Sequence, residues 1–289
     1  MQLINDITAL QEIARELRRD IIRMLTVAGS GHPGGSLSAI DIVTCLYFAQ
    51  MRHRPEEPHW PERDRFILSK GHGVPAVYAV LAKCGYFAKE QLMTLRQIES
   101  PLQGHPDRVR LPGIEASTGS LGQGLSIALG MALASKIDNP DYPYSSTKEN
   151  RGFHVYCMIG DGETQAGQIW EALMAAPHLK ADTLTVILDY NKAQIDGLTN
   201  EIMNLEPLVD KLRAFNWNVE EIDGHNYPQI LGALDRSRRA HGKPTFIVAH
   251  TIKGRGVSFM ESNLVDWHGK TPTPAESEKA LADIEVMKY

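Results

Sequence analysis

The chain has 289 residues, of which 43% are hydrophobic and 22% charged, and its formal net charge is −5 at pH 7. A chain of this size and composition buries a large core when it folds, as ordinary globular proteins do. Its acidic balance, without any run of like charges, argues against nucleic acid and against an anionic membrane surface as partners.

The first predicted element is an amphipathic helix over residues 6–28. It begins at Asp6, a residue type that caps helices, and it ends at Gly29. Apolar side chains recur between these ends at helical spacing: Leu10, Ile13, Leu17, Ile21 and Met24. After the glycine-rich stretch "GSGHPGGS" (29–36), a second helix is predicted over residues 36–51.

From residue 66 onward, strand-like apolar runs alternate with helical stretches. The predicted strands cover residues 66–69, 154–160, 183–190, 217–222 and 245–250. The predicted helices between them cover residues 74–84, 122–137, 166–178, 207–215 and 227–241. This alternation predicts the α/β class, with a doubly wound parallel sheet and helices on both faces, in one domain over residues 1–289. The polar stretch 138–152 is a predicted loop, and residues 254–289 are expected to be irregular ahead of a short terminal helix.

Three cysteines occur singly inside apolar segments: Cys45, Cys84 and Cys157. Their odd number and the absence of C-x-x-C spacing indicate buried thiols in a reducing compartment. No segment approaches about 18 consecutive apolar residues, and the N-terminus has no basic stretch followed by an apolar core. We therefore expect a cytoplasmic protein without a membrane span.

The stretch "CMIGDGETQAG" (157–167) places Asp161 between Gly160 and Gly162, where a predicted strand gives way to a helix. Ligands of open parallel sheets bind outside the carboxyl ends of the strands, so this turn is well placed for a ligand. The two glycines fit the start of a dinucleotide fingerprint, and Asp189 imitates its ribose-binding acid. However, Gln165 stands where the third glycine belongs.

A metal-bound phosphate suits the turn better than a dinucleotide. Asp161 would repel a pyrophosphate unless a divalent cation lay between them. Mg²⁺ takes oxygen ligands, and Asn191 follows its strand as Asp161 follows the preceding one, so both meet at one edge if the strands are neighbours. The alternative is a plain glycine turn with a helix-capping Asp161 and an unrelated Asn191. A P-loop is excluded at "GKT" (269–271), because Leu264 occupies the position of its first glycine.

The G-D-G triplet is followed after 28 residues by Asn191, and this spacing resembles the diphosphate-binding motif of thiamine diphosphate enzymes. The whole chain is similar to transketolase, in its diphosphate-binding domain. The segments that carry the resemblance are "SGHPGGSLS" (30–38), "LSKGHG" (68–73), "GHPD" (104–107), "TGSLGQG" (118–124), "TIKGRG" (251–256) and "WHG" (267–269). The resemblance implies the thiamine diphosphate-binding fold, with thiamine diphosphate and Mg²⁺ as cofactors and Ca²⁺ or Mn²⁺ as possible substitutes for Mg²⁺.

The resemblance also implies a set of site residues. The cofactor would contact His72, Gly119, Ser120, Leu121, Gly160, Asp161, Gly162, Asn191, Lys253 and His268. The metal would take the side chains of Asp161 and Asn191 and the backbone carbonyl of Ala193. Substrate binding and catalysis would fall to His32, His105 and His268. A lone histidine in a polar loop is more often structural, but these histidines all lie beside glycine, and imidazoles suit hydrogen bonding to diphosphate and proton transfer at sugar oxygens.

The activity implied is transfer of a two-carbon ketol unit from a ketose, phosphorylated or otherwise modified, to an aldose, as in pentose phosphate metabolism. A transketolase is more than twice as long as this chain, and the pyrimidine-binding and C-terminal domains have no counterpart here. A separate partner chain is therefore expected to supply those domains and the glutamate that activates the cofactor. The expected assembly is an α₂β₂ heterotetramer.

Ala166 departs from the family, which carries a glutamate at this position in a cluster between two active sites. An alanine at this position also resembles 1-deoxyxylulose-5-phosphate synthase, a related thiamine diphosphate enzyme. An enzyme of that kind is the second interpretation of the sequence. A third interpretation is that the chain is a non-catalytic regulatory or binding subunit. The sequence leaves the donor and acceptor sugars open, because transketolases bind the distal phosphate mainly through the half that is not present here.

Overall fold

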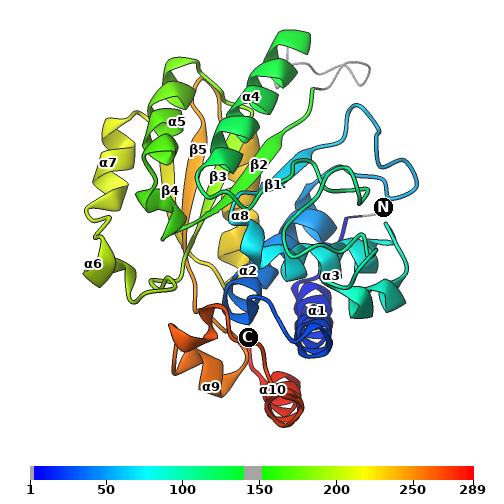
Figure 1. Cartoon of the computed structure of the whole chain (residues 1–289). Coiled ribbons are helices and arrows are strands. Elements are labelled where there is room, and N and C mark those ends of the chain that lie inside the picture. The colour runs from blue at the N-terminus through cyan, green and yellow to red at the C-terminus, as the bar shows by residue number, and fades with distance from the viewer. Residues whose placement is uncertain (1–2, 140–151) are drawn as a thin grey trace.

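The computed structural model describes residues 3–139 and 152–289, so most of the predicted loop 138–152 lies outside the described residues. Five parallel strands form one sheet in the order β1-β2-β3-β5-β4 (Figure 1). They are β1 (Arg65–Leu68), β2 (Val155–Gly160), β3 (Leu184–Tyr190), β4 (Asn218–Asp223) and β5 (Thr245–His250). All five were predicted, each to within one residue of its observed bounds.

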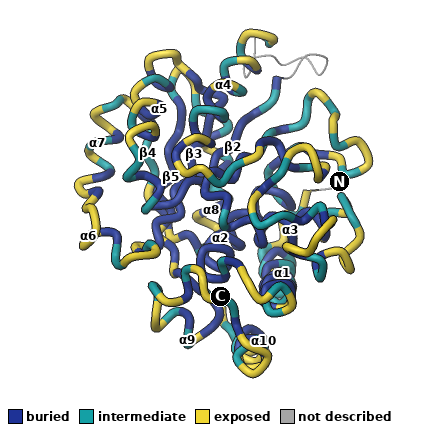
Figure 2. Tube along the Cα trace, in the orientation of Figure 1, coloured by how far each residue is buried: buried dark blue, intermediate teal, exposed yellow. Residues whose placement is uncertain are grey.

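Helices cover both faces of the sheet. One face packs against α4 (Gln123–Asp138), α5 (Gly167–His178) and α7 (Leu208–Ala214). The other face of the sheet shares a second hydrophobic core with five helices: α1 (Ile7–Ala28), α2 (Pro33–Cys45), α3 (Val74–Cys84), α8 (Tyr227–Arg238) and α10 (Pro274–Val286). Successive residues of β2 alternate between the two cores: Cys157 joins the first, and Tyr156 and Met158 join the second. Figure 2 shows the resulting buried sheet, and the predicted doubly wound architecture is confirmed.

The first helix has the predicted ends. The Asp6 side chain accepts a hydrogen bond from the Thr8 amide at 2.9 Å, and Gly29 ends the helix in the left-handed region at φ 62°. The second helix begins at Pro33 instead of residue 36, and a π-helical segment, Leu46–Gln50, continues it. Close packing explains the glycine at residue 34, because a Cβ atom at Gly34 would lie 2.7 Å from the Trp267 carbonyl oxygen. Only glycine allows this approach, and Pro33 occupies the first helical position, where its fixed φ is favourable.

Residues 254–289 contain more helix than was expected. The terminal helix α10 has 13 residues, and a capping box between Thr273 and Glu276 starts it. The short helices α6 (Thr199–Ile202) and α9 (Ser258–Glu261) were not predicted.

None of the helices in the described ranges has the length and apolar character needed to cross a membrane. Cys45 and Cys157 are buried, Cys84 is half-buried, and all three are free thiols.

A buried histidine next to the sheet gives a testable property of the fold. His154 precedes β2, is 1% exposed, and lies 2.7 Å from the Thr185 hydroxyl through Nε2. Burial lowers its pKa from 6.5 to about 3. The unfolded chain therefore binds a proton as the pH falls through 6.5, whereas the folded chain does so only near pH 3, and stability is lost across that window.

We expect His154 to contribute about 2 kcal/mol to the fall in unfolding free energy between pH 7 and pH 5. Denaturant unfolding of the wild type and of His154→Gln at the two pH values measures this share. The exposed His178 on α5 provides the control, since His178→Gln should leave the pH dependence unchanged. Equal pH dependence in wild type and His154→Gln would show that this histidine does not carry the effect.

Candidate functional site

A cavity of about 300 Å³ lies at the carboxyl ends of the strands. The segments that resemble transketolase form its wall, together with the loops that follow β2, β3 and β5. Every predicted site residue lines this cavity except Ser120. Ser120 is exposed, and its hydroxyl accepts a hydrogen bond from Gln123 at 3.2 Å. The structure thus brings together residues that are more than 200 positions apart in the chain.

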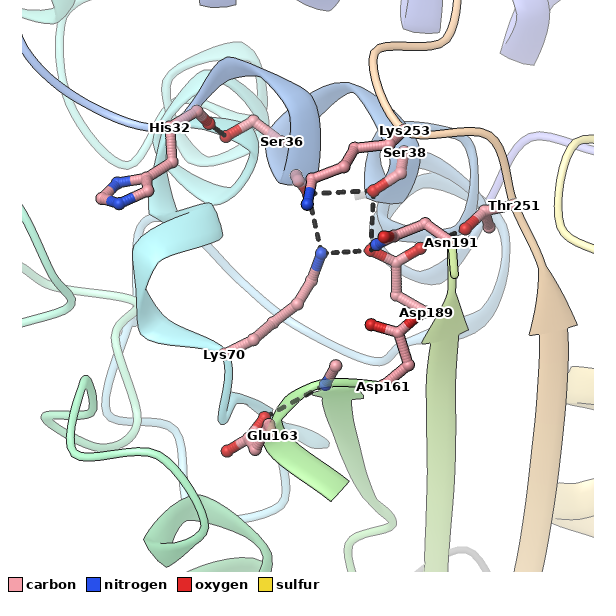
Figure 3. A network of polar contacts seen from close by, with 12 residues as sticks. His32, Ser36, Ser38, Lys70, Asp161, Glu163, Asp189, Asn191, Thr251 and Lys253 are labelled. Carbon is pink, nitrogen blue, oxygen red and sulfur yellow. Dashed lines mark hydrogen bonds and ion pairs between the residues drawn. The ribbon is translucent and has the colours of Figure 1, made fainter. Parts of the chain in front are cut away.

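The register of the sheet explains why Asp161 and Asn191 meet. β2 and β3 are parallel neighbours, and Gly160 is paired with Asp189. The residues that follow these two strands therefore leave the sheet at the same edge (Figure 3). The neighbouring strands on which the predicted convergence depended are confirmed.

Asp161 is a buried carboxylate, only 2% exposed. Its oxygens accept hydrogen bonds from the amides of Gly162 at 2.8 Å and Lys192 at 2.5 Å. Burial, and then the charge of Asp189, raises the pKa of Asp161 to about 6. No ion pair forms between Asp161 and a basic side chain within residues 3–139 and 152–289. A bound cation stabilises the ionised form of a carboxylate that is buried without a basic partner.

Two further oxygen atoms face the same cavity. Asn191 donates its side-chain N–H to Asp189 at 3.1 Å, and this bond orients the amide because a carboxylate only accepts. The Ala193 carbonyl accepts a hydrogen bond from Lys253 Nζ at 2.8 Å. Carboxylate, amide and backbone oxygens are the ligands that Mg²⁺ and Ca²⁺ prefer, so the residues present fit a hard divalent cation.

Lys253 lies between the oxygen atoms and the histidines. It is almost fully buried, and its Nζ is 2.7 Å from Nδ1 of His268. Burial lowers the pKa of Lys253 to about 8. An ammonium group so placed, with no carboxylate bonded to it in the described structure, provides a donor for an anionic ligand such as diphosphate.

Four histidines that line the cavity form a cluster. The ring centroid of His32 lies 5.2 Å from that of His72, 5.6 Å from that of His268 and 6.5 Å from that of His105. His105 is exposed at the mouth of the cavity, and the other three are half-buried. Nδ1 of His32 is buried without a hydrogen-bond partner in the described residues, as expected of a group that awaits a ligand.

Burial is the main cause that lowers the pKa of each of these histidines. The pKa falls to about 4 for His32 and to about 3 for His268. The pKa of His72 lies well below 6.5, and that of His105 is also lowered. Their imidazoles are therefore neutral at pH 7, and each can donate and accept a hydrogen bond at a sugar oxygen.

An ion pair at the wall of the cavity was not predicted from the sequence, and its lysine lines the cavity. Lys70 is buried, forms an ion pair with Asp189, and donates to the Gly35 carbonyl at 2.7 Å (Figure 3). Asp189 also accepts hydrogen bonds from Ser38, at 2.6 Å, and from Thr251. Asp189 is 0% exposed and bonded to these three side chains, so its likeness to a ribose-binding acid is one of sequence position alone. The position of Lys70 inside "LSKGHG" was the signal that could have identified it.

Glu163 was not predicted either. This side chain is 3% exposed and lines the cavity, two residues after Asp161. Its carboxylate accepts hydrogen bonds from Ser69, Gly122 and Gly160. Gly35, in the first glycine-rich segment, and Gln194 and the exposed Ile195, in the loop after β3, complete the set of cavity residues that the sequence did not reveal.

Ala166 lies outside the cavity wall. It is the N-cap residue of α5, and a Cβ atom at Gly122 would lie 3.1 Å from its methyl group. Its amide donates to the Glu163 carbonyl at 3.0 Å. The alanine therefore packs behind the G-D-G turn.

Known proteins are similar to this chain in fold and in sequence. The family model of the transketolase thiamine diphosphate-binding domain matches residues 9–282. The chain is 47% identical to the 6-deoxy-6-sulfo-D-fructose transketolase subunit of Clostridium sp. (strain MSTE9), across 95% of this chain and 98% of that subunit. It is 40% identical to an apulose-4-phosphate transketolase subunit of Phocaeicola vulgatus, across 92% of this chain and 90% of that subunit.

A solved transketolase gives the same result. The crystal structure of transketolase from Campylobacter jejuni matches with a TM-score of 0.88 at 33% identity, across 97% of this chain and 43% of that one. Fold, motif positions and sequence identity agree. The chain belongs to the transketolase family, as a thiamine diphosphate-binding domain of that family.

Proposed function

We propose that this chain is the diphosphate-binding subunit of a two-chain transketolase, which transfers a two-carbon ketol unit from a ketose to an aldose. The observation that carries the proposal is the meeting of Asp161, Asn191 and the Ala193 carbonyl with four histidines in one cavity. The oxygen atoms suit a divalent cation, and the histidines suit diphosphate and sugar oxygens. Neither group alone would indicate this chemistry.

Each part of the cavity has a proposed role. Asp161, Asn191 and the Ala193 carbonyl would hold Mg²⁺, with Ca²⁺ or Mn²⁺ as substitutes. Lys253 and His72 would donate hydrogen bonds to the diphosphate, and His268 would contact both cofactor and substrate. The backbone around Gly119, Ser120 and Leu121 would meet the aminopyrimidine ring, because Gly119 and Leu121 line the cavity.

Thiamine diphosphate, when bound, supplies a nucleophilic carbon and stores the electrons of the cleaved carbon–carbon bond. The chain's own contribution is to orient the cofactor and to handle protons. His32 and His105 would hold or move a proton at the hydroxyl and carbonyl oxygens of the sugar, since their neutral rings both donate and accept. The exposure of His105 at the cavity mouth supports a contact with the incoming substrate.

A partner chain completes this proposal. Two relatives that align over at least 90% of their length with this chain are named as transketolase subunits, whereas the Campylobacter jejuni transketolase is matched over only 43% of its chain. The partner would supply the pyrimidine-binding and C-terminal domains and the glutamate that activates the cofactor. An α₂β₂ heterotetramer in the cytoplasm is the proposed working form.

The donor substrate distinguishes transketolase from a 1-deoxyxylulose-5-phosphate synthase-like enzyme. Ala166 is the residue that suggested this second interpretation. The purified complex of this chain and its partner is expected to use a ketose donor and to give no detectable product from pyruvate. A panel of xylulose 5-phosphate, apulose 4-phosphate and 6-deoxy-6-sulfofructose, each offered with an aldose acceptor, measures the preference. Turnover of pyruvate in preference to every ketose would overturn the transketolase assignment.

A non-catalytic role is the remaining alternative. Failure to bind thiamine diphosphate with any partner would support it. Calorimetry of the assembled complex with thiamine diphosphate and Mg²⁺ decides this question independently of any substrate. Saturable binding supports the enzyme, and the absence of binding supports the regulatory subunit.

A further inference from the structure

Three separate loops build the diphosphate side of the cavity. They are residues 68–73, residues 118–124 and the turn that follows β2 at Gly160. The first two loops touch through glycine: a Cβ atom at Gly71 would lie 2.8 Å from the Gly119 amide nitrogen. A Cβ atom at Gly124 would similarly lie 2.4 Å from the Ser69 hydroxyl oxygen. A small movement of one loop therefore displaces the other.

Glu163 is bonded to all three loops at once. Oε1 accepts hydrogen bonds from the Ser69 hydroxyl at 2.5 Å and from the Gly122 amide at 2.9 Å. Oε2 accepts a hydrogen bond from the Gly160 amide at 3.1 Å. All three partners donate, and an ionised carboxylate only accepts, so the group matches its surroundings without a competing donor.

We propose that Glu163 is a positioning residue, whose carboxylate sets the relative placement of the three loops that receive the diphosphate and its cation. The inference rests on the proposed function and deepens it. Ser69 precedes Lys70 and is close to His72, Gly122 follows Leu121, and Gly160 precedes Asp161. One side chain thereby connects the proposed metal ligand, the proposed diphosphate donors and the backbone proposed to contact the aminopyrimidine.

Glu163 acts through other groups and is not itself a ligand in this proposal. Both of its oxygen atoms are directed at the loops, whereas the Asp161 carboxylate bonds only to backbone amides of its own edge of the sheet. A positioning residue should affect the affinity for the cofactor more than the rate at saturating cofactor. A residue that merely stabilises the fold would lower the amount of active enzyme and leave the cofactor affinity unchanged.

Glu163→Gln tests this difference in the complex of the chain with its partner. Glutamine keeps the shape but replaces one acceptor with an NH₂ group that must face a donor. We expect the Kd for thiamine diphosphate, at fixed Mg²⁺, to rise about 10-fold or more, because a buried donor loses a charged partner. The kcat at saturating cofactor should change less than about threefold. Glu278→Gln, an exposed substitution on α10, is the matched control and should change neither quantity.

A double-mutant cycle with Ser69→Ala isolates the contact itself. Ser69→Ala should raise the Kd by a smaller factor, about threefold, and the double variant should lose less affinity than the two single variants combined. An unchanged Kd in Glu163→Gln, or fully additive effects, would overturn the proposal. If Glu163→Gln does not fold, an unchanged Kd in Ser69→Ala overturns it alone. A wild-type complex that binds no thiamine diphosphate would instead defeat the proposed function.

Discussion

Replacing Asp161 with asparagine is expected to weaken Mg²⁺-dependent binding of thiamine diphosphate by about 100-fold or more. Asp161 is the only anionic group among the three proposed metal ligands, and it lies buried at the end of β2. Loss of one partner from a buried charge pair costs about 3 kcal/mol or more, which corresponds to a factor of at least about 100 in affinity. Asparagine has nearly the same size, so the cavity itself should keep its shape.

Calorimetric titration of the assembled complex at several Mg²⁺ concentrations measures this effect. The matched control is Asp196→Asn, because Asp196 is an exposed carboxylate in the loop that follows β3 and does not line the cavity. Thermal unfolding without the cofactor separates binding from folding. Asparagine turns an NH₂ group toward the amide of Gly162 or Lys192, so we expect the variant to lose about 1–3 kcal/mol of stability and still to fold. Cofactor affinity equal to that of the wild type would remove Asp161 from the metal site.

The central strands β2 and β3 were predictable because both faces of the sheet are buried there, whereas the edge strand β4 has one buried residue, Ile222. β2 and β3 are uninterrupted buried runs, and their short length, with Gly160 and Gly162 after β2, favours parallel strands over helices. The meeting of Asp161 and Asn191 followed from the same reasoning, since neighbouring parallel strands end at one edge.

The start of α2 was predicted too late, because the two glycines favour a loop in sequence. Pro33 at the first helical position was the missed signal, and the close approach of Trp267 explains why Gly34 is a glycine.

The pairing of the charged groups at the cavity wall was not predictable from sequence spacing. Lys70 and Asp189 are 119 residues apart, and Ser69 and Glu163 are 94 residues apart. No local pattern indicates which buried lysine meets which buried carboxylate, because the pairing depends on how β1, β2 and β3 are ordered in the sheet. The ligand roles of the residues around the cavity stay predictions, and the substitutions above test them.

Dependence on a partner chain is the other large effect expected. Removal of a general acid or base typically costs a factor of about 100 to 10,000 in rate, and the glutamate that activates the cofactor is proposed to lie on the partner. The described part of the chain offers one buried glutamate at the cavity, Glu163, and its carboxylate is bonded to three loops. We therefore expect this chain alone to be at least about 1,000-fold less active than the complex.

Ketol transfer measured for this chain alone, for its partner alone and for their mixture tests the central claim most directly. The partner is the chain that copurifies with this one, and thiamine diphosphate, Mg²⁺ and the same ketose and aldose are present throughout. We predict transfer only in the mixture, with the rate reaching its maximum near equal amounts of the two chains. Full activity from this chain alone, or no transfer from a mixed complex that has bound thiamine diphosphate, would contradict the claim.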